Sequence, residues 1–136
     1  MKTEEMLKKL EALIGSDDFE YDSEVIMNQL AAEGAGSEII EALFGMMERH
    51  PLADFGMPGA MVHFIEDFDP EYIPLLIRSL QKRPALHTVW MLNRCINGSE
   101  QKEDFLGLLR NIAGNDAIEQ EIKALAQEFL DYQVNA

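Results

Sequence analysis

The spacing of apolar residues is the feature that most restricts what this chain can fold into. Leu, Ile, Val, Met and Phe recur at intervals of three and four residues almost throughout, with no convincing run of strict alternation. Such intervals place apolar side chains on one face of an α-helix, whereas alternation is the pattern of a half-buried strand. The sequence therefore predicts an all-α fold of about eight helices.

Capping residues, glycines and prolines divide this pattern into separate helices. Ser, Thr and Asp can accept a hydrogen bond from a free N–H at a helix start, and glycine often ends a helix. Proline disfavours helical geometry in the residue before it. The predicted helices start at or are capped by Thr3, Asp22 or Ser23, Ser37, Pro58, Asp69, Pro84, Ser99 and Asp116. They end near Gly15, Gly34, Pro51, Phe68, Leu80, Asn97, Gly114 and Leu130, and the clearest loop is PLADFGMPG, residues 51–59.

Helix starts recur at intervals of roughly thirty residues, as from Ser37 to Asp69 and from Asp69 to Ser99. A helical hairpin of this period needs neighbours to cover its apolar face, which is the pattern of stacked repeats. We therefore expect stacked antiparallel hairpins in a HEAT-like right-handed array, with a compact helical bundle as the alternative. A chain of 136 residues suits one domain, residues 1–136.

The charge is strongly acidic. With 25 Asp and Glu against 11 Lys and Arg, the net charge is -14, which repels nucleic acid and anionic membranes and attracts basic proteins. Ordinary solubility charge is the simpler interpretation. The acidic run SDDFEYDSE, residues 16–24, either forms a solvated connection or presents Asp17, Asp18, Glu20 and Asp22 to a basic partner.

Several classes of protein are not expected. The single cysteine, Cys95, rules out an intrachain disulfide and a cysteine-rich zinc site. The first residues, MKTEEMLKKLEALIG, match neither a secretory signal nor a membrane span, so we expect a cytoplasmic protein. No nucleophile elbow, phosphate-binding glycine loop or clear Ser-His-Asp grouping is present, so we expect neither an enzyme nor a cofactor.

The sixth helix carries unusual side chains for a helix that could simply pack. At about 100° per residue, one face is apolar and comprises Ala85, Val89, Leu92 and Ile96. The opposite face comprises His87, Trp90, Met91 and Arg94. Tryptophan and arginine are favoured anchors of protein interfaces, so this face is a candidate binding stripe. Alternatively, Trp90 lies under a neighbouring helix while Arg94 pairs with a carboxylate.

The fourth helix shows a related pattern. Its predicted core face holds Met61, Ile65 and Phe68, and its other face holds His63, Glu66 and Asp67. If the fourth and sixth helices occupy equivalent places in successive hairpins, their outward faces merge, with an ion pair between Glu66 and Arg94. The predicted partner-binding patch comprises His63, Glu66, Asp67, His87, Trp90, Met91 and Arg94.

A metal centre is the less favoured interpretation of these residues. His63 and Glu66 share a helical face, and His87 with Asp67 or Asp69 could complete a set of ligands. Helical dimetal proteins, however, use the opposite order, Glu-x-x-His, in two copies with additional glutamates. The chain offers no second copy, so we expect no metal site.

Two segments resemble a known family. DFGMPGAMVHFIE (54–66) and RPALHTVWMLNRCIN (83–97) are similar to small all-helical immunity proteins encoded beside bacterial polymorphic and contact-dependent toxins, over roughly the middle third of the chain. The resemblance implies a stoichiometric inhibitor that binds and blocks one cognate toxin domain, and it supplies no catalytic residues.

The acidity agrees with that function, because it would speed association with a basic toxin such as a nuclease. The alternative is a HEAT-like scaffold that joins cellular proteins without inhibiting them. A toxin-like gene beside this one would favour the inhibitor. The sequence leaves the oligomeric state open.

Overall fold

The computed structural model describes residues 2–55, 59–97 and 99–135. Its elements are α1 (Lys2–Ala12), α2 (Phe19–Ala32), the short 3-10 helix η1 (Ser37–Ile39), α3 (Ile40–Arg49), α4 (Ala60–Glu66), α5 (Tyr72–Lys82), α6 (Leu86–Ile96), α7 (Lys102–Ala113) and α8 (Gln120–Asn135). Within these residues there is no strand, so the all-α prediction is confirmed. The helix start expected at Pro58 lies outside the described residues, and α6 ends at Ile96, one residue before the expected Asn97.

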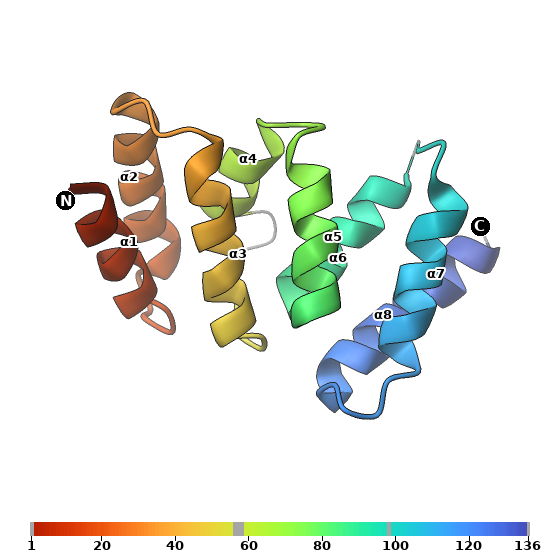
Figure 1. The fold of residues 1–136 in the computed structure, drawn as a ribbon. Helices are drawn as coiled ribbons and strands as arrows, with labels where there is room; N and C mark the ends of the chain where they lie inside the picture. The colour runs from red at the N-terminus through yellow and green to blue at the C-terminus, as the bar shows by residue number, and fades with distance from the viewer. Residues whose placement is uncertain (1, 56–58, 98, 136) are drawn as a thin grey trace.

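The helices form two layers, as Figure 1 shows. The front layer contains α1, α3, α5 and α7 in chain order, and the rear layer contains α2, α4, α6 and α8. Successive helices pack as pairs in α1/α2, α5/α6 and α7/α8, which confirms the expected stacking of antiparallel hairpins. The helix α4 follows the long loop after α3 and packs mainly against α2. The rear surface near the N-terminus is therefore built by α2 and α4 together.

Glycines follow the ends of the first two helices, Gly15 three residues after Ala12 and Gly34 two residues after Ala32. Gly15 and Gly34 have φ angles of 87° and 79°, a conformation that only glycine adopts without strain. The predicted helix starts are less accurate, since α2 begins at Phe19 and includes both Asp22 and Ser23. Phe19 is buried against Phe55, with ring centroids 5.9 Å apart, so a tertiary contact draws this earlier turn into the helix.

Buried side chains from all eight described helices form one apolar core. The predicted core face of α6 is confirmed, since Ala85, Val89, Leu92 and Ile96 are all buried. On α2, Ile26 and Leu30 are buried, whereas Val25 is 41% exposed. Among the described residues, no helix combines the length and apolarity needed to cross a bilayer.

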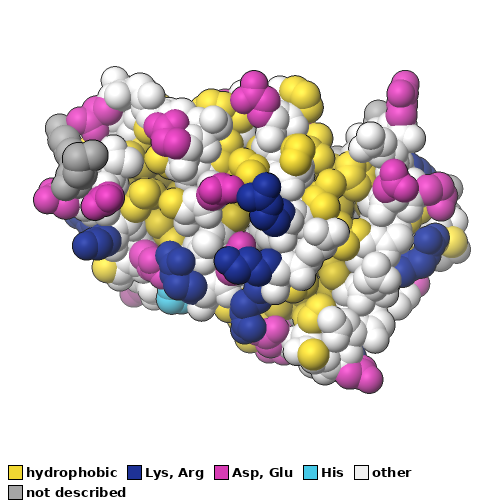
Figure 2. Space-filling model, in the orientation of Figure 1, with side chains coloured by type: hydrophobic (Ala, Val, Ile, Leu, Met, Phe, Trp, Pro, Cys, Tyr) yellow, Lys and Arg dark blue, Asp and Glu magenta, His cyan; other side chains and the backbone are white. Residues whose placement is uncertain are grey.

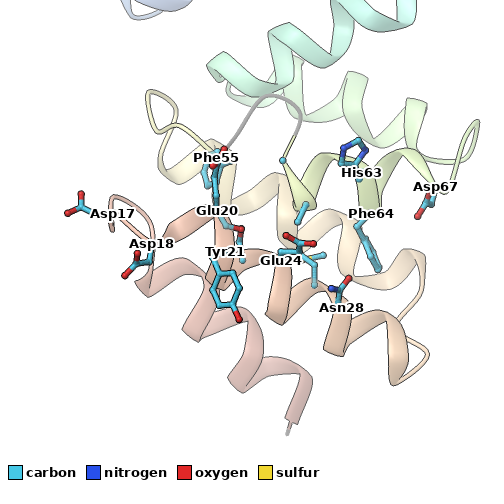
Figure 3. A pocket seen from close by; sticks show the side chains of 14 residues that line it. Asp17, Asp18, Glu20, Tyr21, Glu24, Asn28, Phe55, His63, Phe64 and Asp67 are labelled. Carbon is cyan, nitrogen blue, oxygen red and sulfur yellow. The ribbon is translucent and has the colours of Figure 1, made fainter.

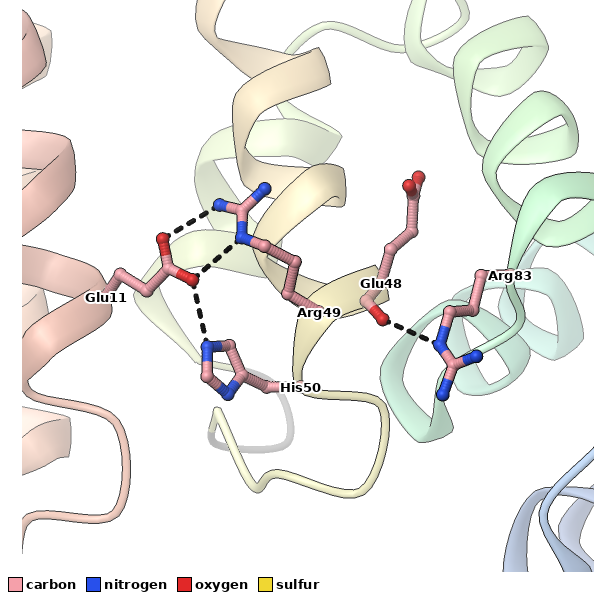
Figure 4. A network of polar contacts seen from close by, with 5 residues as sticks. All are labelled: Glu11, Glu48, Arg49, His50 and Arg83. Carbon is pink, nitrogen blue, oxygen red and sulfur yellow. Dashed lines mark hydrogen bonds and ion pairs between the residues drawn. The ribbon is translucent and has the colours of Figure 1, made fainter.

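Ion pairs connect neighbouring helices of the front layer. The Arg49 guanidinium on α3 donates to both carboxylate oxygens of Glu11 on α1, with both N···O distances at 2.8 Å (Figure 4). Further along the layer, Arg78 on α5 donates to Glu41 on α3, and Arg83 donates to the Glu48 carbonyl and to the Glu119 carboxylate. Figure 2 shows this face, where Lys and Arg side chains lie beside Asp and Glu. Most of the basic charge here is therefore already engaged within the fold.

Candidate protein-binding site

The predicted contact between α4 and α6 exists. The Arg94 guanidinium donates to both carboxylate oxygens of Glu66, with Nε···Oε2 at 2.8 Å and Nη2···Oε1 at 2.9 Å. The same guanidinium lies over the Trp90 ring, 4.8 Å from its centroid. Both interactions favour a fixed arginine, and the cation–π contact adds to the ion pair. Arg94 therefore joins α6 to α4 within the fold, although its side chain remains 42% exposed.

Two members of the predicted patch do not reach the surface. His87 is 1% exposed and Met91 is fully buried, so the expectation that both face outward is wrong. The physical reason is the position of α6, which packs against α3, α5, α7 and α8. A helix with neighbours on several sides buries more than one face. Of the residues proposed on α6, only Trp90, which is half-buried, and Arg94 remain accessible.

The buried His87 instead holds the loop that follows α3. Its Nε2 atom accepts a hydrogen bond from the Phe55 backbone N–H at 2.9 Å, and the two rings meet edge to face. The Nδ1 atom must then carry the proton, and it has no hydrogen-bond partner among the described residues. Burial lowers the pKa of His87 to about 4, against a smaller opposing effect of the Asp54 carboxylate. His87 is thus a neutral structural residue.

His63 and Asp67, the remaining residues of the patch, face a different helix. Both line a groove of about 690 Å³ between α2 and α4. Figure 3 shows His63, Phe64 and Asp67 along one side and the α2 side chains Tyr21, Glu24 and Asn28 along the other. The two helices that form this groove pack directly against one another. The patch predicted over α4 and α6 is therefore divided between this groove and the Glu66–Arg94 contact.

The groove is lined by acidic side chains, and no basic side chain in its described lining balances their charge. Five carboxylates line it, those of Asp17, Asp18, Glu20, Glu24 and Asp67, while its described lining contains no Lys or Arg. The sequence shows why: between Leu10 and Ile77 there are fifteen Asp and Glu residues and a single cation, Arg49. That arginine is bound to Glu11 in the front layer. The groove thus carries a concentrated negative potential that the protein itself does not neutralise.

An exposed aromatic residue lies among these carboxylates. Tyr21 lines the groove with 71% of its surface exposed. Tyrosine supplies apolar area and a polar hydroxyl at low entropic cost, which suits a protein interface. The acidic segment 16–24 is one surface predicted for a basic partner, but Tyr21 is not among the residues predicted to face that partner, and α4 is not predicted to lie across from it. Stacking of successive hairpins, applied to the second and fourth helices, would have found this neighbour.

The residues considered for a metal site are not brought together. Glu66 is engaged by Arg94, His87 is buried beside Phe55, and His63 faces the groove. Within the described parts of the chain, no group of three or more His, Cys, Asp or Glu is close enough to hold a metal ion. The groove carboxylates lie just before α2, on α2 and at the C-cap of α4, and are therefore spread along the groove.

The residues of the groove come from parts of the chain that are distant in sequence, namely 17–28 on one side and 55 with 59–67 on the other. Local sequence patterns alone therefore describe only half of it. Searches of protein-family models, of curated proteins and of solved structures gave no match to this chain.

Proposed function

We propose that this chain is an immunity protein that binds a cognate bacterial toxin domain and neutralises it by stoichiometric occlusion. The observation that carries the proposal is the groove between α2 and α4, whose five carboxylates have no Lys or Arg in the described lining. A surface of this kind attracts a basic protein, and electrostatic steering raises the rate of association. Rapid, tight binding is what neutralisation of a toxin requires.

The accessible residues of the predicted patch extend this surface. His63 and Asp67 line the groove on α4, while Glu66 on the same helix holds Arg94 beside Trp90. A stable interface buries roughly 800 Å² on each partner, more than a single groove provides. We therefore assign the groove to electrostatic capture and the Trp90–Arg94 edge to additional contact area. No catalytic group is needed for either role.

A titration against the product of the adjacent gene tests the proposal. The variant Glu20→Gln/Glu24→Gln/Asp67→Asn removes three groove charges from exposed positions, so the fold should persist. The matched control, Glu100→Gln/Glu121→Gln/Glu128→Gln, removes the same charge from exposed positions elsewhere. We expect the groove variant to bind at least about tenfold more weakly and the control to bind like the wild type.

A growth assay separates inhibition from simple binding. Co-expression with the toxin-like neighbour should restore growth with the wild type and the control, and less effectively with the groove variant. Binding without restored growth would favour the scaffold function over neutralisation. Failure of the wild type to bind the neighbouring product at all would refute the immunity proposal.

A further inference from the structure

The two walls of the groove carry polar residues at the same helical interval. On α2, Glu20, Glu24 and Asn28 follow one another at i, i+4, and His63 on α4 has the same spacing to Asp67, the C-cap of that helix. Residues four apart on a helix lie on one face and are separated by about 6 Å along the axis. The groove therefore presents two rows of polar groups with a regular repeat (Figure 3).

From this repeat we infer that the groove seats one α-helix of the partner, with Lys or Arg at i, i+4 along the seated face. The inference rests on the proposed function, since that helix belongs to the protein that is neutralised. A seated helix that runs along α2 has cations at the same interval of about 6 Å, so each can meet a carboxylate of Glu20, Glu24 or Asp67. The row on α2, from Glu20 to Asn28, spans two such steps, or about 12 Å, which is just over two helical turns.

An extended segment fits the groove less well than a helix. The walls are α-helices, whose backbone N–H and C=O groups are already paired within α2 and α4. A strand laid between them would bury its own backbone groups without partners, which is costly. A helix satisfies its backbone internally and needs only side-chain contacts. This is the helix-in-groove mode of peptide recognition, with charge in place of a purely apolar face.

Tyr21 supplies the apolar contact that charge alone does not. Its ring is 71% exposed at the groove, one residue from Glu20 and three from Glu24. An aromatic ring among carboxylates can cover the aliphatic stem of a lysine or stack on a guanidinium. Met27 and Phe64 are buried and also line the groove, so they add apolar surface to it. The partner helix should therefore carry one large apolar residue or arginine next to its cations.

A synthetic probe tests the inference without the natural partner. The probe is a capped, Ala-rich peptide of roughly 15 residues, long enough for partial helicity, with Lys at i, i+4 along one face and one Leu beside them. The comparison peptide has the same composition with its Lys residues spread around the helix. Amide chemical shifts of the intact, labelled protein report where each peptide binds. We expect the shifts to be confined to α2 and α4.

The variants give the sharper comparison. Tyr21→Ala should weaken binding of the probe about thirtyfold, while Tyr21→Phe should retain it. Glu20→Gln/Glu24→Gln/Asp67→Asn should weaken it at least about tenfold, and Glu100→Gln/Glu121→Gln/Glu128→Gln should leave it unchanged. Equal binding of the two peptides, equal loss in both triple variants, or shifts outside α2 and α4 would overturn the inference.

The two proposals can fail separately. If the probe binds the groove but the neighbouring gene product does not bind the protein, the inference about the groove stands and the immunity function falls. If the neighbouring product is neutralised equally well by the wild type and the groove variant, the immunity function stands and the inference about the groove falls.

Discussion

The buried histidine predicts a specific dependence of stability on pH. His87 has a pKa of about 4 in the folded protein because of burial, against an ordinary value of 6.5. Below pH 6.5 the imidazole is therefore protonated in the unfolded chain but stays neutral in the folded protein. The free energy of unfolding falls as the pH decreases towards 4. A gap of about 2.5 pH units corresponds to roughly 3 kcal/mol of unfolding free energy, lost across this window.

The variant His87→Gln isolates this effect. The glutamine amide oxygen can accept the Phe55 N–H that Nε2 accepts in the wild type, and the amide does not titrate in this range. Urea unfolding of both proteins, followed by circular dichroism at several values between pH 7 and pH 4, gives the free energies. Protonation of carboxylates affects both proteins and largely cancels in the difference. We expect the wild type to lose about 3 kcal/mol more than the variant between these limits.

A control and a direct measurement complete the test. His63→Gln replaces an imidazole that is exposed rather than buried, and it serves as the control for the substitution itself. Nitrogen chemical shifts of the wild-type imidazole at pH 7 should identify a neutral ring with the proton on Nδ1, as the hydrogen bond from Phe55 requires. The assignment of a buried neutral histidine would be refuted if the free energies of unfolding of the wild type and His87→Gln fell equally with pH. A charged His87 ring at pH 6 would also refute it.

Further predictions concern residues that hold the helices together. Arg94→Lys should cost about 1 kcal/mol in urea unfolding, because lysine cannot make the paired hydrogen bonds to Glu66 or stack in the same way. Phe55→Ala should cost about 3 to 5 kcal/mol, because the ring is 1% exposed between α2 and α6. The Arg49 hydrogen bond lowers the pKa of Glu11 to about 2, so the stability that this pair contributes is present above pH 4.5 and lost as the pH falls through about 2. Glu11→Gln should therefore lower the unfolding free energy at pH 7 by about 1 kcal/mol, a difference that should shrink below pH 4.5.

The helical fold could be predicted because its evidence is local. Apolar spacing identifies helices, and Gly15 and Gly34 mark two helix ends through a backbone conformation that other residues avoid. Helix starts were harder to predict, since a tertiary contact such as that between Phe19 and Phe55 can extend a helix beyond its apparent cap. Propensity at a helix terminus is weak compared with the burial of an aromatic ring.

The candidate site was predicted less well, because exposure depends on neighbours that spacing does not specify. The core face of α6 was identified correctly, yet His87 and Met91 on the other side are also buried. One indication was available: α6 has a single charged residue, Arg94, in eleven. A helix with so little charge around it is expected to be covered on several sides. The Glu66–Arg94 contact, by contrast, followed directly from the expected stacking of hairpins.

The distribution of arginines explains why the described lining of the groove contains carboxylates and no guanidinium. In the front layer, Arg49 joins α3 to α1 and Arg78 joins α5 to α3, while in the rear layer Arg94 joins α6 to α4. Each of these junctions places a guanidinium against a carboxylate from the neighbouring hairpin. The described lining between α2 and α4 contains carboxylates from both sides of the junction and no guanidinium. A basic helix seated there would supply the cations that arginines of the chain itself supply at these three junctions.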